Sequence, residues 1–318
     1  MNEFKQKLVT VLGPTAVGKT RTSIELAKAL DGEIISGDSM QIYRGMDIGT
    51  AKVTEDEMDG VPHYLIDIKQ PNESFSAAEF QQLATDLVTD INKRGKVPII
   101  AGGTGLYVKS VTHQYAFSEA KEDASYRKEM ERIAENEGPV LFHQRLKEID
   151  PVSYESIHPN NVRRVVRALE VFHVTGEPVS ASKDALPEHS PYNLVNVGLT
   201  MDREPLYERI NRRVDIMMET GLLEEARRLH RAGVRNCQSV QAIGYKEIYQ
   251  FIEGRLSLED AVSELKQNSR RYAKRQLTWF RHQMEMDWFD MTEQREEKIQ
   301  KILPFVAGKL AENEKCSN

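Results

Sequence analysis

Gly13-Pro14-Thr15-Ala16-Val17-Gly18-Lys19-Thr20 is the stretch from which the fold of this chain can be predicted. It matches the phosphate-binding loop, G-x-x-x-x-G-K-[ST]. Residues 8–12, before it, are apolar or β-branched, as expected of a buried strand, and residues 20–30 carry apolar side chains at helical spacing. A strand, a glycine loop and a helix form the context in which this motif binds phosphate. A glycine turn that only leads into a helix is the alternative.

The chemistry of this loop is that of an anion site. Backbone N–H groups and the helix N-terminus converge on the anion, the Lys19 side chain adds a positive charge, and the Thr20 hydroxyl can bind Mg²⁺. We therefore predict that residues 13–20 hold a di- or triphosphate, with Mg²⁺ as the cofactor.

Length and composition narrow the class of protein. A chain of 318 residues exceeds the size at which a single core is usual, so two domains are expected. No apolar run approaches the roughly 18 residues of a membrane span, and the N-terminus lacks the apolar segment of a signal peptide. Cys237 and Cys316 are too few for a disulfide framework or a zinc site. These features predict a cytoplasmic protein without a membrane partner, and we expect a monomer.

The net charge of −6 argues against a nucleic-acid partner, because such proteins are often basic. The basic residues are nevertheless clustered. Arg163, Arg164 and Arg167 lie in a stretch without acids, and residues 269–282 form a second one. Local basic faces of this kind are compatible with RNA binding.

The order of the predicted elements indicates an α/β fold. Strands are expected at residues 33–36, 63–68 and 96–101, alternating with helices, which predicts a P-loop NTPase-like parallel sheet with helices on both faces. Residues 113–192 are typical of helices with polar connections, residues 195–200 of another strand and residues 240–253 of a further helix. We therefore predict a catalytic core of residues 1–113 and 195–318 and an inserted, mainly helical domain of residues 114–194.

A second group of polar residues is predicted to lie beside the phosphate loop. The strand at 33–36 delivers Asp38 to the sheet edge at which ligands bind in open α/β folds. Phosphate-loop enzymes place an acid after an apolar strand to organise Mg²⁺, and Asp38 and Asp67 are the candidates. Ser36, Ser39 and Gln41 near Asp38 suit an organic substrate instead, and a turn or cap aspartate is the alternative.

Seven further segments, in order and without a missing block, resemble the bacterial tRNA dimethylallyltransferases. They are Ile35-Ser36-Gly37-Asp38-Ser39-Met40-Gln41-Ile42-Tyr43, Met46-Asp47-Ile48-Gly49-Thr50-Ala51-Lys52, Gly102-Gly103-Thr104-Gly105-Leu106-Tyr107, His158-Pro159-Asn160-Asn161, Arg164-Val165-Val166-Arg167-Ala168-Leu169-Glu170, Ala242-Ile243-Gly244-Tyr245-Lys246-Glu247 and Lys274-Arg275-Gln276-Leu277-Thr278-Trp279-Phe280. With the phosphate loop, the resemblance covers residues 13 to about 281. The bacterial form is indicated because no C-terminal Cys/His pair is spaced as a zinc finger.

The resemblance implies transfer of a dimethylallyl group from dimethylallyl diphosphate to N6 of adenosine 37 in the anticodon stem-loop of tRNA. The phosphate loop would then hold a leaving diphosphate and not a nucleotide. Asp38 would be the general base. Lys19, Thr20 with Mg²⁺, and Arg213 would neutralise the diphosphate, and Thr104 would contact donor or tRNA. By spacing alone, Arg213 would instead be placed on a solvated helix face.

The resemblance also implies a set of tRNA contacts. They are Asp38, Ser39, Met40, Gln41, Thr104, Arg127, Arg163, Arg164, Arg167, Gln241, Ala242, Ile243, Gly244, Tyr245 and Lys246. For Arg163 and Arg167 a salt-bridged surface is the alternative. Residues 274–281 are either a base-stacking face or, through Trp279 and Phe280, a buried aromatic pair.

Two other functions compete with this hypothesis. An adenylate isopentenyltransferase would use free AMP or ATP, but it would need neither the helical insertion nor residues 243–246. A small-molecule kinase or a regulatory nucleotide-binding module is the alternative from a different class.

Overall fold

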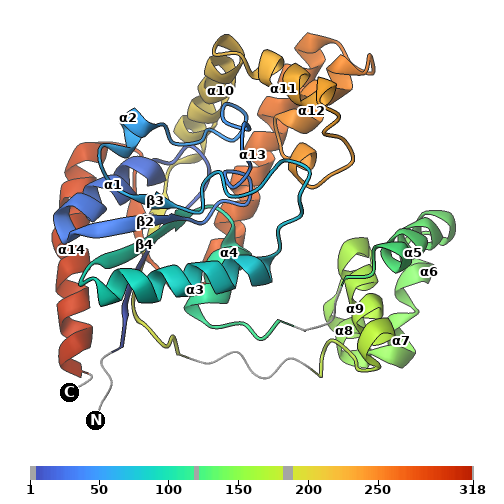
Figure 1. Ribbon diagram of the computed structural model, residues 1–318, viewed down its shortest axis with the longest axis horizontal. Helices are drawn as coiled ribbons and strands as arrows, with labels where there is room; N and C mark the ends of the chain where they lie inside the picture. The colour runs from blue at the N-terminus through green and yellow to red at the C-terminus, as the bar shows by residue number, and fades with distance from the viewer. Residues whose placement is uncertain (1–4, 118–121, 182–188, 317–318) are drawn as a thin grey trace. The chain divides into compact units, whose positions relative to one another are not determined.

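The structure is a computed structural model that describes residues 5–117, 122–181 and 189–316; the first four residues, on which the prediction for the N-terminus partly rests, lie outside them. The described residues contain a six-stranded sheet with the order β3-β2-β4-β1-β5-β6, in which all neighbours are parallel (Figure 1). The strands are β1 (Lys7–Leu12), β2 (Gly32–Ser36), β3 (His63–Tyr64), β4 (Val97–Gly102), β5 (Asn193–Thr200) and β6 (Asp287–Asp290). The predicted α/β fold class is confirmed.

Helices surround this sheet in the core. They are α1 (Lys19–Leu30), α2 (Glu55–Met58), α3 (Ala77–Lys93), α4 (Gly105–Thr112), α10 (Arg203–Glu219), α11 (Leu222–Arg231), η1 (Ser239–Gln241), α12 (Tyr245–Ile252), α13 (Leu258–Gln283) and α14 (Arg295–Cys316). Figure 1 shows α10, α11 and α12 grouped at one end of the core, with α13 running from them towards the sheet.

The two faces of the sheet are covered by separate apolar clusters. Successive strand side chains point to opposite faces. Leu8 and Leu12 of β1 therefore pack in the cluster that holds α3 and α4, whereas Val9 and Val11 pack in the cluster of α1 and α14. Residues after β1 thus leave from the centre of a sheet that is buried on both sides.

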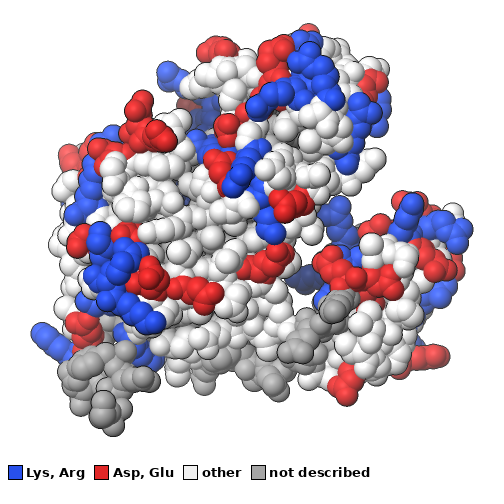
Figure 2. Space-filling view, viewed as in Figure 1, with Lys and Arg blue, Asp and Glu red and all other residues white. Residues whose placement is uncertain are grey.

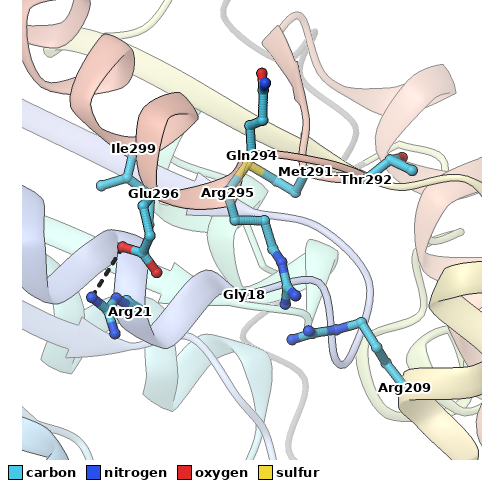
Figure 3. Close-up of a pocket in the computed structure, with 9 residues that line it drawn as sticks. All are labelled: Gly18, Arg21, Arg209, Met291, Thr292, Gln294, Arg295, Glu296 and Ile299. Atoms are coloured by element: carbon cyan, nitrogen blue, oxygen red, sulfur yellow. Dashed lines mark ion pairs between the residues drawn. The ribbon is translucent and has the colours of Figure 1, made fainter.

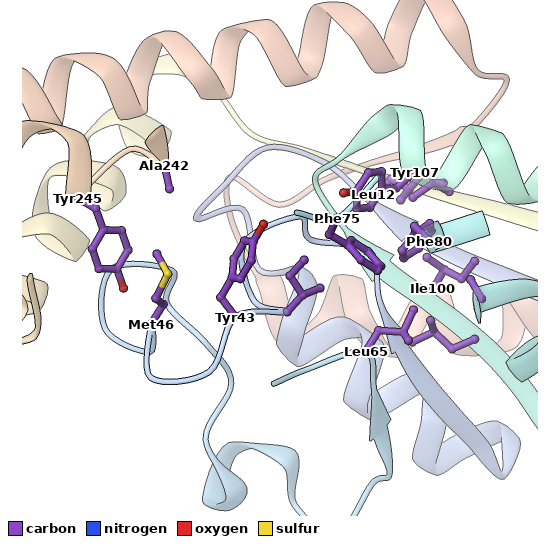
Figure 4. Packing of buried hydrophobic residues seen from close by; sticks show 14 of the residues in the cluster. Leu12, Tyr43, Met46, Leu65, Phe75, Phe80, Ile100, Tyr107, Ala242 and Tyr245 are labelled. Atoms are coloured by element: carbon purple, nitrogen blue, oxygen red, sulfur yellow. The ribbon is translucent and has the colours of Figure 1, made fainter. Parts of the chain in front are cut away.

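The first cluster extends beyond the sheet to the loop after β2. Figure 4 shows Tyr43 and Met46 of this loop among buried side chains, with Met46 beside Tyr245 of α12. Tyr43, Met46 and Tyr245 are all fully buried. The apolar core therefore joins the loop that starts at Asp38 to the helices near the C-terminal end of the chain.

The insertion forms a unit of its own. Contacts divide the chain into residues 1–113 with 189–318 and residues 114–188, so the insertion ends before the predicted position 194. Its helices are α5 (Ala124–Glu137), α6 (Pro139–His143), α7 (Leu146–Ile149), α8 (Pro151–Ser156) and α9 (Val162–Thr175), packed around their own apolar cluster. The earlier end has a physical reason, since Tyr192 is buried in the core cluster and Asn193 begins β5.

Two local predictions were wrong, and one strand was not predicted. The strand expected at residues 63–68 has only two residues, because Leu65 and Asp67 adopt positive φ angles of 60° and 54°. The helix expected at residues 240–253 is interrupted at Gly244, whose φ of 108° is not helical. Strand β6 was not predicted; it is four residues long and is paired with β5.

Candidate active site

The phosphate loop links β1 to α1. The Lys19 Nζ donates to the carbonyl oxygens of Gly13 at 3.1 Å and Pro14 at 2.8 Å. Burial and the nearby Arg213 guanidinium lower the pKa of Lys19 to about 8, while the Asp38 carboxylate acts in the opposite direction. The charged form of Lys19 is therefore disfavoured at the loop as it stands, and an anion bound there would favour the protonated form.

Two arginines of α10 face this loop. Arg209 Nε donates to the Ala16 carbonyl at 2.8 Å, and Arg213 Nη1 donates to the Thr15 hydroxyl at 3.3 Å. Burial lowers the pKa of Arg213, with Glu57 and Asp38 acting in the opposite direction. Arg213 does not lie on a solvated helix face, and its guanidinium is a second cation beside the loop.

The loops after β2 and β4 are bonded to one another. The backbone N–H of Ser39 donates to the Thr104 hydroxyl at 3.1 Å, and the N–H of Thr104 donates to the Gly37 carbonyl at 3.2 Å. Between them, the half-buried Asp38 accepts the Met40 N–H on Oδ1 at 2.8 Å. Asp38 thus makes the contact of a turn aspartate, and its charge also acts on Lys19 and Arg213. The structure brings the four predicted catalytic residues into one region.

A buried glutamine of α13 was not singled out from the sequence. Gln276 accepts the Thr15 N–H at 2.9 Å and donates to the Gly103 carbonyl at 3.0 Å. Its signal in the sequence is a polar residue at helical spacing from Ala273 and Phe280, both buried. Phe280 is buried in the apolar core, and the half-buried Trp279 packs edge-on against it with ring centroids 5.5 Å apart.

Glu225 of α11 is a second buried polar residue that was missed. Its carboxylate accepts the backbone N–H groups of Asp47, Ile48 and Gly49 at 2.9–3.0 Å and the Tyr245 hydroxyl at 2.6 Å. A side chain at position 49 would place its Cβ 2.5 Å from the Tyr245 ring, so the close approach requires glycine. The detectable signal is an acid on the apolar stripe of α11.

The predicted tRNA-contact segment of residues 241–246 is partly internal. Gln241 and Lys246 are exposed, whereas the side chains of Ala242 and Tyr245 belong to the core. If this segment meets RNA, the side chains available are those of Gln241, Ile243 and Lys246. Figure 2 shows Lys and Arg side chains gathered over the part of the core that carries α11 and α12.

The arginines predicted to bind RNA in the insertion fall into two groups. Arg163 and Arg164 are exposed. Arg127 and Arg167 form ion pairs with the fully buried Glu170 at 2.8 and 2.5 Å. Burial disfavours the Glu170 carboxylate, but Arg127 and Arg167 act against it and on balance lower its pKa. The ion pair of Arg167 with Glu170 therefore agrees with the alternative given for Arg167, a salt-bridged surface.

A pocket of about 450 Å³ is lined by Gly18 of the phosphate loop and by residues of α1, α10 and the segment 291–299. Figure 3 shows Arg209 and Arg295 pointing into the same space, while Arg21 is paired with Glu296 at 3.0 Å. None of the four predicted catalytic residues lines it.

Two features are absent from the part of the chain that the structure describes. No group of three or more His, Cys, Asp or Glu side chains is arranged to hold a metal ion. No helix among these residues combines the length and the apolar character needed to span a membrane.

Lys19 and Arg213 lie at a phosphate loop between a parallel strand and a helix, and the half-buried Asp38 carboxylate lies near both. With the inserted helical unit, this arrangement defines the class of phosphate-loop α/β proteins. The chain belongs to the IPP transferase family, whose model matches residues 41–283. This confirms the resemblance found in the sequence.

The similarity to relatives extends over nearly the whole chain. The chain is 60% identical over 306 residues to the tRNA dimethylallyltransferase of Bacillus mycoides, and the match covers 96% of each chain. It is 58% identical over 314 residues to that of Halalkalibacterium halodurans, covering 98% of this chain and all of the other.

Two solved structures are also similar. The tRNA isopentenylpyrophosphate transferase of Bacillus halodurans has a TM-score of 0.76 at 57% identity and covers 98% of this chain and 99% of its own. A eukaryotic dimethylallyltransferase acting on tRNA has a TM-score of 0.83 at 29% identity, with 97% and 80% covered. Family membership decides against a small-molecule kinase.

Proposed function

We propose that this chain transfers the dimethylallyl group of dimethylallyl diphosphate to N6 of adenosine 37 in the anticodon stem-loop of tRNA and releases diphosphate. Family membership and the similarity to tRNA dimethylallyltransferases support the reaction class. The observation that supports the residue roles is the convergence of Lys19, Arg213 and Asp38 at the phosphate loop.

The phosphate loop is the donor site. The diphosphate gains charge as the allylic C–O bond breaks, so cations already fixed around it stabilise the transition state more than the ground state. Lys19 and Arg213 are these cations, and hydrogen bonds hold both at the loop, Lys19 to Gly13 and Pro14 and Arg213 to Thr15.

Mg²⁺ is the proposed cofactor, and the donor set fits it. Mg²⁺ usually keeps several waters and is held by few protein oxygens together with substrate phosphates, so it needs no cluster of carboxylates. The exposed Thr20 hydroxyl at the start of α1 would hold the ion. Bound there, Mg²⁺ would add positive charge next to the diphosphate.

Asp38 is the proposed general base. The adenine amine is a weak nucleophile because its lone pair is delocalised into the ring, and it loses a proton as the new bond forms. A carboxylate within hydrogen-bond reach accepts that proton. The Met40 N–H orients the Asp38 carboxylate through Oδ1, and Thr104 holds the neighbouring Ser39.

The RNA partner is an anticodon stem-loop whose target base is taken out of its stack, because an enzyme cannot reach a stacked base. Arg163 and Arg164 supply exposed positive charge for its phosphates. We infer a cytoplasmic enzyme that acts as a monomer.

Labelled dimethylallyl diphosphate, incubated in parallel with unmodified tRNA, AMP and ATP, tests this proposal. Label is expected in tRNA alone, and Lys19→Ala should abolish it. Label in AMP or ATP would indicate the adenylate-type transferase. Robust ATP hydrolysis without tRNA, lost in Lys19→Ala, would indicate a nucleotidase.

A further inference from the structure

Gln276 connects two loops that the sheet alone does not hold together. Strands β1 and β4 are neighbours in register, with Leu12 opposite Gly102. This pairing fixes the ends of the two strands, but the loops that follow them are not joined by the hydrogen bonds of the sheet. The Gln276 side chain, 6% exposed, hydrogen-bonds Thr15 of the first loop and Gly103 of the second.

The contact at Gly103 requires glycine, and the contact at Thr15 requires a side-chain acceptor. A Cβ at position 103 would lie 2.1 Å from the Gln276 Nε2, so any other residue there would displace the amide. At the other end, the Thr15 N–H is directed to Gln276 Oε1. The Thr15 backbone N–H is therefore already hydrogen-bonded within the protein. The anion must be held by the backbone N–H groups that follow Thr15.

The contacts continue from Gln276 to the proposed base. Thr104 follows Gly103 and accepts the Ser39 N–H, and Ser39 follows Asp38. Tyr272, one turn before Gln276, lies in the same group. Burial and the Asp38 charge raise the pKa of Tyr272 to about 12, while the Thr104 and Gln276 side chains act in the opposite direction.

We propose that Gln276 is a positioning residue that sets the separation between the loop holding the donor diphosphate and the loop carrying Thr104 on the acceptor side. This rests on the proposed function, which assigns the two loops to donor and acceptor. Transfer requires the allylic carbon and the adenine nitrogen to be about 3–3.5 Å apart, and a misplacement of about 1 Å costs on the order of 100-fold in rate.

The test compares Gln276→Met, which keeps the shape but neither hydrogen bond, with Gln276→Glu, which keeps an acceptor for the Thr15 N–H. Gln283→Met is the matched control, because Gln283 is exposed on the same helix and bonds only Lys109 among the contacts described. Pyrophosphate affinity, tRNA affinity, single-turnover rate and the urea midpoint are measured for each.

Gln276→Met is expected to lower the single-turnover rate at saturation by about 10- to 100-fold, with both affinities close to wild type. Gln276→Glu should lose rate as well, because it cannot donate to Gly103. A wild-type rate in either variant would overturn the proposal. So would a loss of both affinities together with a lowered urea midpoint, which marks a structural role. If the proposed function itself fails, the wild-type protein transfers no label to tRNA.

Discussion

Replacing Glu225 by Gln should destabilise the core, and the structure allows the size of the effect to be worked out. The carboxylate accepts four hydrogen bonds, from the N–H groups of Asp47, Ile48 and Gly49 and from the Tyr245 hydroxyl. An amide offers one accepting oxygen in place of two. Its least costly orientation keeps that oxygen on Asp47 and Ile48 and turns the NH₂ group towards Gly49 and Tyr245.

The tyrosine hydroxyl can accept as well as donate, so it can rotate to receive the new N–H. The Gly49 N–H cannot, and it is left facing a donor. One buried unsatisfied donor costs about 1–3 kcal/mol, and this is the expected loss in the free energy of unfolding for Glu225→Gln. Glu225→Ala leaves all four donors without a partner and should cost on the order of 3–5 kcal/mol.

Urea unfolding followed by circular dichroism measures both variants. Glu224→Gln is the control, because Glu224 is the neighbouring acid with its side chain 66% exposed and paired to Arg227. It should change the free energy by less than about 0.5 kcal/mol. Equal midpoints for wild type and Glu225→Gln would refute the hydrogen-bond reasoning.

Three further predictions concern the site. Because the pKa of Lys19 is lowered to about 8 and a bound anion favours its protonated form, pyrophosphate affinity should fall as the pH rises through about 8. Calorimetric titration should show this fall reduced in Lys19→Arg, and equal pH profiles would contradict it. Asp38→Asn should retain pyrophosphate binding but lose about 10²–10⁴-fold in single-turnover rate. A weakened donor affinity with a raised Mg²⁺ requirement would instead make Asp38 a metal organiser. Arg163→Ala should make the slope of log tRNA affinity against log salt shallower by about one unit, without a change in the urea midpoint. Arg167→Ala should lower that midpoint because Glu170 loses an ion pair, so identical behaviour of the two variants would argue against separate roles.

The fold could be predicted from local patterns where those patterns were strong. The phosphate loop with its flanking strand and helix, and the Ser76–Glu79 capping box at the start of α3, are both encoded within a few residues. Strand β6 could not be found this way. It has four residues that begin and end with Asp, and its pairing with β5 depends on a contact between distant parts of the chain.

The candidate site shows the same division. Family motifs indicated Lys19, Asp38, Thr104 and Arg213, although the helical spacing of Arg213 favoured solvent. The spacing was misleading because it does not show what a helix packs against, and here α10 faces the phosphate loop.

The residues that sequence reasoning missed share a physical reason. Gln276 and Glu225 are buried polar side chains whose donors and acceptors lie far away in sequence; Thr15 and Gln276 are 261 residues apart. A buried polar group is tolerated only where partners satisfy it, and no pattern local to α11 or α13 names those partners. Both residues lie on helices that follow the insertion in the chain, and both hydrogen-bond loops that precede it. The loops that carry the proposed chemistry therefore acquire their positions only when the C-terminal part of the core has packed onto them. The hydrogen bonds to these loops explain why polar residues stand on helix faces where the pattern would predict apolar ones.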